Sequence, residues 1–264
     1  MRGQNTFFIF AMALLAATSA AAQNETPPWS QADAYHDPEE MSEARKAVQH
    51  EHGGGTAYYF LADRFEFQSR DGDPALFFEG QGWWGGDRNK LWLKTETEYS
   101  FDADEFEEAE VQALWSRAIT RYFDFQAGLR HDFSPDPSRT YAALGVQGLA
   151  PYWFEVDAAL FVSDKGDVST RLETEYELML TQRLILQPRA ETEISFQTVD
   201  PLEIGDGFTN IELGARLRYE FKREFAPYIG VNWNRDLGAT ADFSRAASED
   251  PSTLSFVAGL RFWF

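Results

Sequence analysis

Apolar and polar residues alternate along most of this chain with a period of two, which is the period of a β-strand. From Val168 to Leu180 the even positions are all apolar, threonine or tyrosine, whereas the odd positions are mostly glutamate and arginine. The same alternation runs from Leu91 to Phe101 and from Ile211 to Phe221. The pattern predicts strands that have one apolar face and one charged face.

The chain ends in a strand of the same kind. Between Phe256 and Phe264 every even position is apolar, and the final residue is a phenylalanine. A last strand that ends on an aromatic residue is typical of outer-membrane barrels. Strands of about ten residues, tilted by roughly 40°, cover the apolar band of such a membrane, which is about 25 Å tall. We therefore expect an all-β fold, a transmembrane antiparallel β-barrel of the outer-membrane type.

The alternation and the turn signals divide the chain into strands joined by connectors of two lengths. Short connectors alternate with longer polar ones, as in barrels whose short turns are periplasmic and whose long loops are external, and this arrangement predicts two periplasmic ends. The second segment has the weakest pattern, so ten strands is the alternative to about twelve. The twelve expected segments are 56–68, 75–84, 89–101, 106–118, 121–132, 139–149, 152–164, 168–181, 183–197, 208–222, 225–237 and 253–264.

Two segments precede the barrel, which we expect over residues 55–264. Residues 1–22 have the features of a signal peptide: Arg2 gives a positive start, an apolar stretch follows, and Ala20 and Ala22 form a small-residue cleavage site. Residues 23–54 hold three of the four histidines and lead into the barrel through Gly53, Gly54 and Gly55. We expect them to form a flexible periplasmic tail.

Charge and composition exclude several classes of function. Without residues 1–22 the chain has 22 basic and 43 acidic residues, a net charge of −21, which excludes nucleic acid as a partner because its binding needs a basic face. Cysteine is absent, so soft metals can be bound only through methionine or histidine.

The alternation sends a set of charged residues into the expected lumen. This set forms either an ion-paired network that fills the barrel or a path along which an acidic excess draws cations. The expected members are Arg64, Glu66, Lys94, Glu96, Glu98, Asp124, Arg130, Glu155, Asp157, Arg171, Glu173, Glu175, Arg189, Glu191, Glu193, Glu212, Arg216, Arg218 and Glu220. Aromatic residues near strand ends are expected to form the interfacial girdles: Trp83, Trp84, Tyr122, Phe123, Tyr152, Trp153, Phe225 and Phe264.

Several long stretches resemble one family. They read GGDRNKLWLKTE at 85–96, RAITRYFDFQAGLRHD at 117–132 and VAGLRFWF at 257–264, and the similarity extends over 138–189. Together they resemble the copper resistance protein B family. The resemblance implies a protein of the Gram-negative outer membrane that binds copper, helps to export it from the periplasm and is not an enzyme. It also implies copper ions, membrane lipid and a periplasmic copper-binding protein as partners.

The candidate copper ligands are few. In an extended chain, His50 and His52 lie about 6.6 Å apart on one face, so two imidazoles can reach one ion, and His36 and Met41 can complete the site. The alternative is a solvated tail with scattered histidines. His131 is a further candidate, although alternation places it on the outward face with Phe125 and Leu129.

Two other functions fit a barrel of this size. An outer-membrane phospholipase needs a serine and a histidine within hydrogen-bond reach, and here only Ser134 lies near His131. A passive pore or structural barrel without a metal role is the other alternative. Copper binding that weakens as the histidines become protonated would distinguish the copper function from both.

Overall fold

The structure, a computed structural model, describes residues 30–52, 55–70 and 74–264. The chain divides into two units, Met1–Gly54 and Gly55–Phe264. The expected signal peptide, residues 1–22, and the first residues of the expected tail, 23–29, lie outside the described residues.

The described part of the first unit is helical. A short 3₁₀ helix, η1 (Gln31–Ala34), precedes the α-helix α1 (Pro38–His52). Asp37 caps α1, because its carboxylate accepts hydrogen bonds from the amides of Glu39 at 2.8 Å and Glu40 at 3.3 Å. Pro38 occupies the first helical position, where its missing N–H has no cost.

The extended conformation expected for this segment is therefore wrong for Pro38–His52. The sequence does contain a helix-start pattern: Asp37-Pro38-Glu39-Glu40 combines a capping residue, a proline at the first helical position and acidic residues in the first turn. The helix was not predicted because the polar composition of residues 23–54 favoured a flexible tail.

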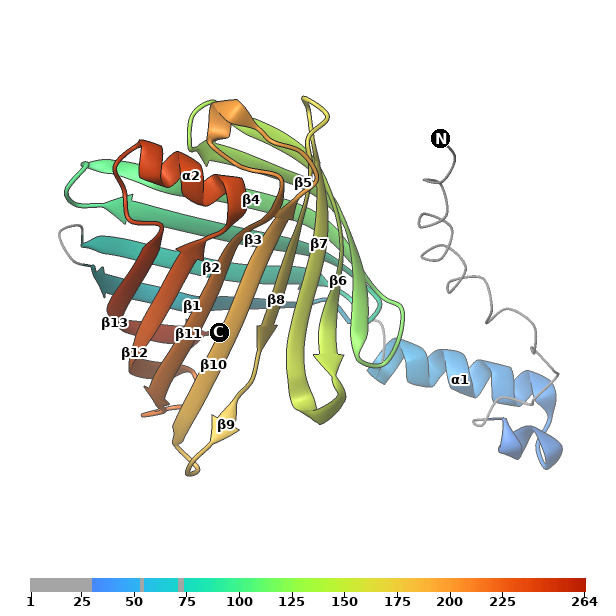
Figure 1. Ribbon diagram of the computed structural model, residues 1–264. Helices are drawn as coiled ribbons and strands as arrows, with labels where there is room; N and C mark the ends of the chain where they lie inside the picture. The colour runs from blue at the N-terminus through green and yellow to red at the C-terminus, as the bar shows by residue number, and fades with distance from the viewer. Residues whose placement is uncertain (1–29, 53–54, 71–73) are drawn as a thin grey trace. The chain divides into compact units, whose positions relative to one another are not determined.

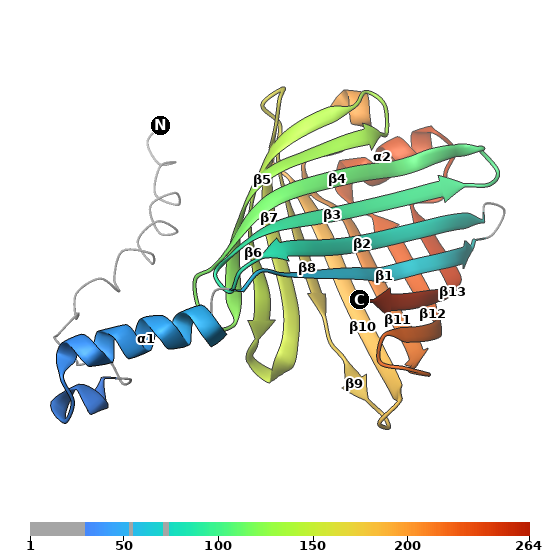
Figure 2. The ribbon, with the colours of Figure 1, turned by 180° about the vertical axis from the view of Figure 1, so that it is seen from behind.

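The second unit is a closed antiparallel barrel (Figures 1 and 2). Each strand pairs with its neighbours in sequence, and β13 pairs with β1 to close the ring. The strands are β1 (Ala57–Ser69), β2 (Ala75–Gly85), β3 (Asn89–Ser100), β4 (Glu105–Ala118), β5 (Phe123–Ser134), β6 (Arg139–Ala150), β7 (Phe154–Ser163), β8 (Val168–Glu175), β9 (Leu178–Met179), β10 (Leu184–Ser195), β11 (Gly207–Tyr219), β12 (Phe225–Asp236) and β13 (Ser252–Trp263).

The prediction of about twelve strands is confirmed for the described residues. Both β8 and β9 pair with β10, one after the other, so they are two parts of the single strand expected at 168–181. The break has a simple cause. The amide of Tyr176 donates to the carbonyl of Pro188 at 3.1 Å, but Pro188 has no N–H to return the bond.

The two faces of the wall differ as the alternation predicts. Outward side chains are apolar and exposed, for example Leu129 at 59%, Ile229 at 64% and Phe256 at 66%. Inward side chains are charged and buried, for example Arg64 at 2% and Glu66 at 1%. The largest buried groups of the barrel are thus polar, the reverse of a water-soluble domain.

The two ends of the barrel also differ. Both ends of the barrel sequence lie at one end, which we call the short-turn end, and the two longest connectors, 196–206 and 237–251, lie at the other, the long-loop end (Figure 1). The connector from β12 to β13 forms the helix α2 (Gly238–Ala246), where the sequence predicted only a loop. Thr240 of α2 accepts a hydrogen bond at 3.0 Å from the amide of Gly205 in the β10–β11 loop, which includes the 3₁₀ helix η3 (Asp200–Leu202).

The 3₁₀ helix η2 (Pro151–Trp153) forms the turn between β6 and β7 at the short-turn end. Among the described residues, no helix has both the length and the apolar character needed to cross a bilayer.

The cap of α1 can be tested by substitution. Asp37→Ala removes the acceptor for two helical amides and should weaken the first turn by about 1 kcal/mol. Hydrogen exchange at residues 39–42 should then be faster, whereas Asp37→Asn, which keeps an acceptor, should exchange nearly as the native protein does. Equal exchange in the alanine and asparagine variants would show that Asp37 does not cap the helix.

Candidate functional site

The candidate site is the charged lumen of the barrel. A bulge in β1 between Ala62 and Phe65 turns two consecutive residues inward, so that Asp63 and Arg64 both contribute to the lumen. Elsewhere the period of two places one inward residue on every second position. Burial or ion pairs confirm the lumen charges expected from the sequence as inward, except for Glu155, which is exposed but lines the lumen cavity.

Three arginines form a layer across the middle of the lumen, which we call the arginine layer: Arg64, Arg171 and Arg189. Arg64 of β1 lies 3.1 Å from Glu212 of β11. Arg189 of β10 binds the same Glu212 carboxylate at 2.8 Å, and it also binds Glu173 at 2.8 Å. The Glu212 carboxylate thus links two arginines from different strands.

Arg171 of β8 reaches the opposite wall. Its guanidinium lies 3.1 Å from Glu110 of β4 and 3.3 Å from Glu96 of β3. It also binds Glu193 of β10 at 2.7 Å. The contacts with Glu110 and Glu96 join strands that are four and five places apart in the ring, so they cross the lumen, whereas Glu193 lies on the neighbouring strand. In the described structure the arginine layer closes the barrel with ion pairs.

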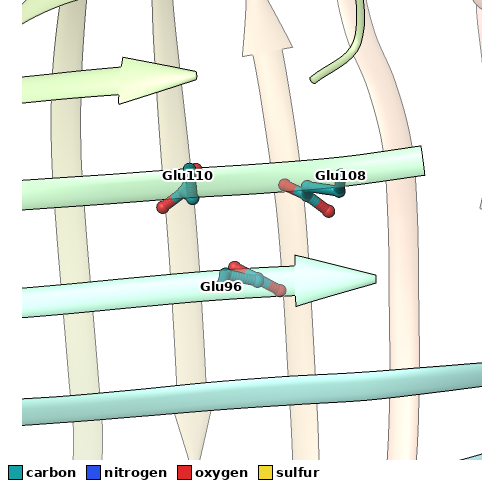
Figure 3. Close-up of side chains that lie close together, drawn as sticks. All are labelled: Glu96, Glu108 and Glu110. Carbon is teal, nitrogen blue, oxygen red and sulfur yellow. The ribbon is translucent and has the colours of Figure 1, made fainter. Parts of the chain in front are cut away.

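The carboxylates of Glu96, Glu108 and Glu110 converge from β3 and β4 (Figure 3). One oxygen from each lies within 4.8 Å of the others, a spacing at which three carboxylates can hold one cation. The guanidinium of Arg171 contacts all three carboxylates, with a distance of 3.8 Å to Glu108, while Arg130 binds Glu110 at 2.7 Å and Arg64 binds Glu96 at 3.3 Å. In this arrangement a mobile cation can replace the Arg171 guanidinium at the same carboxylates.

A second group of buried charges holds β1 to β11. Arg216 binds Glu66 through two parallel hydrogen bonds of 2.8 and 2.9 Å, and the hydroxyl of Tyr228 donates to the same carboxylate at 2.9 Å. Because β12 and β13 lie between β11 and β1 in the ring, the Arg216 side chain must extend across both strands to reach Glu66. Glycines make this possible, because a Cβ at Gly230 would lie 3.0 Å from Cγ of Arg216 and one at Gly259 would lie 2.6 Å from the Tyr228 hydroxyl.

A cavity of about 430 Å³ occupies part of the lumen. The charged residues that line it are nine acids and five bases, so the cavity has an acidic excess. Two of the acids, Glu155 and Glu175, are directly opposed across β7 and β8, and among the described residues neither has an ion pair within 4 Å. The field of the walls therefore favours a cation in the cavity.

An aromatic arc lines the lumen near the short-turn end: Trp263, Tyr59, Trp83 and Trp92, on four adjacent strands. Trp83 was expected in the outer girdle, and that prediction is wrong. Its directly paired partner is Trp92, which lines the cavity, and paired residues share a face. The ammonium of Lys90 lies 5.3 Å above the Trp83 ring. Trp84, 61% exposed, does face outward, whereas Tyr122, also expected in the girdle, lines the lumen cavity.

His131 lies on the outward face of β5, as the alternation predicts. Its ring is 2.8 Å from the hydroxyl of Thr140 and packs edge-on against Phe133. The hydroxyl of Ser134 donates instead to the carbonyl of Phe106. The structure therefore does not pair His131 with Ser134, as the phospholipase alternative required.

The tail residues are not brought together. His36 and His50 are exposed, and Met41 is half-buried. On a helix Met41 and His50 are about 13 Å apart along the axis and on opposite faces. His50 lies on this helix rather than in the extended chain expected for it, and the His52 side chain lies outside the described part.

The buried ion pair can be tested by its contribution to stability. Arg216→Met removes the guanidinium and leaves the Glu66 carboxylate buried with only neutral partners, the Tyr228 hydroxyl and the Gln68 amide, which should cost about 3 to 5 kcal/mol. Guanidinium chloride unfolding in detergent micelles measures the loss. Lys165→Met, which breaks an exposed pair with Asp164, should leave the unfolding midpoint unchanged. Equal midpoints for the two variants would contradict a structural role for Arg216.

Comparisons with known proteins agree with the geometry. Residues 56–264 match the family model described as copper resistance protein B precursor (CopB). A copper resistance protein B homolog of Pseudomonas syringae pv. tomato is 40% identical over 261 residues, 96% of this chain and 84% of that protein. Copper resistance protein B of Escherichia coli is 44% identical over 213 residues, 81% of this chain and 71% of that protein.

Solved structures support the fold. The NanC porin aligns with a TM-score of 0.52 at 11% identity, over 78% of this chain and 99% of that one, which shows a shared barrel architecture. The barrel is thus an outer-membrane β-barrel like the porins. The match along the whole barrel and the identity to two relatives show that this chain belongs to the copper resistance protein B family.

Proposed function

We propose that this barrel gives copper tolerance by binding copper ions in its acidic lumen and helping to export them from the periplasm. The observation that carries the proposal is the cavity with nine acids and five bases in a member of the copper resistance protein B family. We place the short-turn end and the N-terminal tail in the periplasm, following the rule for outer-membrane barrels. In this proposal the tail selects copper and the lumen binds it during export.

The lumen favours divalent copper. Its charged walls offer carboxylate oxygens, which are hard ligands that suit Cu²⁺ better than Cu⁺ but do not select copper over other divalent cations. His131 points outward, and Met179, 67% exposed, lies beside the short turn after β9, so neither supplies a soft ligand to the cavity. Selection of copper over other cations must then come from ligands outside the cavity.

The tail is the proposed source of that selection. His36, Met41, His50 and His52 provide imidazole and thioether groups, which bind copper in its two oxidation states. Since α1 separates Met41 from His50, each ligand acts alone or binds after the helix opens. Capture by scattered ligands would be weak and fast, which suits transfer of an ion to the barrel or from a periplasmic copper-binding protein.

Passage through the lumen would require the arginine layer to open. The guanidinium of Arg171 already contacts Glu96, Glu108 and Glu110, so an arriving cation competes with it for the same oxygens. These ion pairs also argue against a passive pore, because an open pore needs a water-filled path. We propose that copper displaces Arg171 and then moves between carboxylates.

The arginine layer gives a prediction for conductance. Arg171→Gln removes the central cation and leaves its carboxylate partners, so the barrel should conduct cations at least several-fold better than the native protein in planar bilayers. Lys165→Gln, on an exposed loop, should conduct as the native barrel does. Equal currents in the Arg171 variant and the native barrel would contradict the proposed path.

The tail gives a prediction in cells. Replacing His36, His50 and His52 by alanine should raise cellular copper above that of cells with the intact protein, because less copper is captured for export. Replacing Lys46 and Gln49 by alanine provides a control on the same helix. Copper is measured in cells with equal amounts of folded barrel in the outer membrane. If the histidine variant protects as well as the intact protein, the capture role is wrong.

A further inference from the structure

Charge is separated between the two ends of the barrel. Among the described residues, the connectors of the long-loop end contain eleven acids and three bases. The turns of the short-turn end contain five bases and three acids, and one of these acids, Glu220, is buried in the lumen. In a chain with a net charge of −20, a basic end is an exception that needs a cause.

Four of the bases at the short-turn end are free to act on something outside the barrel. We call Arg88, Arg117, Arg183 and Lys222 the basic rim. All four are exposed, and within the described part of the chain none has an ion pair within 4 Å. Arg121 and Arg223 are different, because Arg121 lines the lumen cavity and Arg223 lies 3.9 Å from Glu220.

The basic rim is spread around the circumference of the barrel. Its members come from the β2–β3 turn, the end of β4, the β9–β10 turn and the β11–β12 turn. A compact docking site for one protein would gather its charges on one side. The four charges fall into two pairs on different sides of the ring, Arg88 beside Arg117 and Arg183 beside the turn that holds Lys222, which matches a partner that surrounds the barrel.

Three of these positions, Arg88, Arg117 and Lys222, lie next to outward aromatic side chains of the lipid-facing surface. Arg117 follows Trp115, 45% exposed, on the outward face of β4. Lys222 follows Phe221, which is 63% exposed, and Arg88 follows Trp84 by four residues. Outward aromatic side chains mark the level of the lipid headgroups, and long basic side chains beside them extend toward the phosphates.

We propose that the basic rim binds the anionic headgroups of phospholipids in the leaflet around the short-turn end. These headgroups share a phosphate group, and each carries a net negative charge at the membrane surface. Each base near an anionic surface strengthens binding by up to about fivefold. The lipid thereby fixes the depth and orientation of the short-turn end, whatever the barrel transports.

The test is lipid retention by the full chain. The protein is placed in detergent micelles with equal amounts of phosphatidylglycerol and phosphatidylcholine, and native mass spectrometry counts the lipids that stay bound. The native barrel should retain phosphatidylglycerol in preference. Arg88→Gln, Arg117→Gln and Arg183→Gln together should reduce that preference at least about fivefold.

A matched variant neutralises three exposed bases at or near the long-loop end, Lys165, Arg235 and Arg245, and should keep the preference. Inorganic phosphate at the same ionic strength as a chloride control should not displace the lipid. Equal retention by the rim variant and the native barrel would overturn the proposal and leave an acidic protein as the partner. Displacement by free phosphate would also overturn it, because the rim would then recognise the ion without the lipid.

Discussion

The ion pairs across the lumen are the interaction on which the rest of the barrel depends. A strand that crosses a membrane needs an apolar outer face, so its polar residues gather inside. A ring of twelve strands leaves a lumen too narrow for many charged side chains to keep their own hydration. Charges brought so close must pair, because an unpaired buried charge costs several kcal/mol. The layer of Arg64, Arg171 and Arg189 is the outcome.

This constraint shapes the backbone as well as the side chains. The bulge in β1 adds an inward residue, so that Asp63 can bind Arg261 while Arg64 joins the arginine layer. Glycines at 230 and 259 leave room for Arg216 and Tyr228. The same pairing limits function. Walls made of carboxylates and guanidinium groups attract cations but do not choose among them, and a lumen closed by ion pairs opens only when a competing cation takes the place of an arginine.

The period of two made the barrel predictable from the sequence. It predicted the positions of the strands, the inward direction of residues such as Arg189 and the outward direction of His131. The partners of the arginines could not be predicted, because contacts such as Arg171 with Glu110 join residues 61 positions apart across a ring whose stagger the sequence does not state. The face of Trp83 was missed because an aromatic residue near a strand end suits either the girdle or the lumen. The α1 helix was not predicted, although Asp37 and Pro38 are typical residues for the start of a helix. The break between β8 and β9 could not be predicted from their own residues, because it follows from Pro188 on another strand.

A double-mutant cycle between Arg171 and Glu110 tests the cross-lumen pairing most directly. The free energy of unfolding in micelles is measured for the native barrel, Arg171→Met, Glu110→Gln and the double variant. If the two side chains bind each other across the lumen, their coupling energy should be between about 1 and 3 kcal/mol. Effects that add to within about 0.3 kcal/mol would show that the two walls are independent and would contradict a lumen closed by ion pairs.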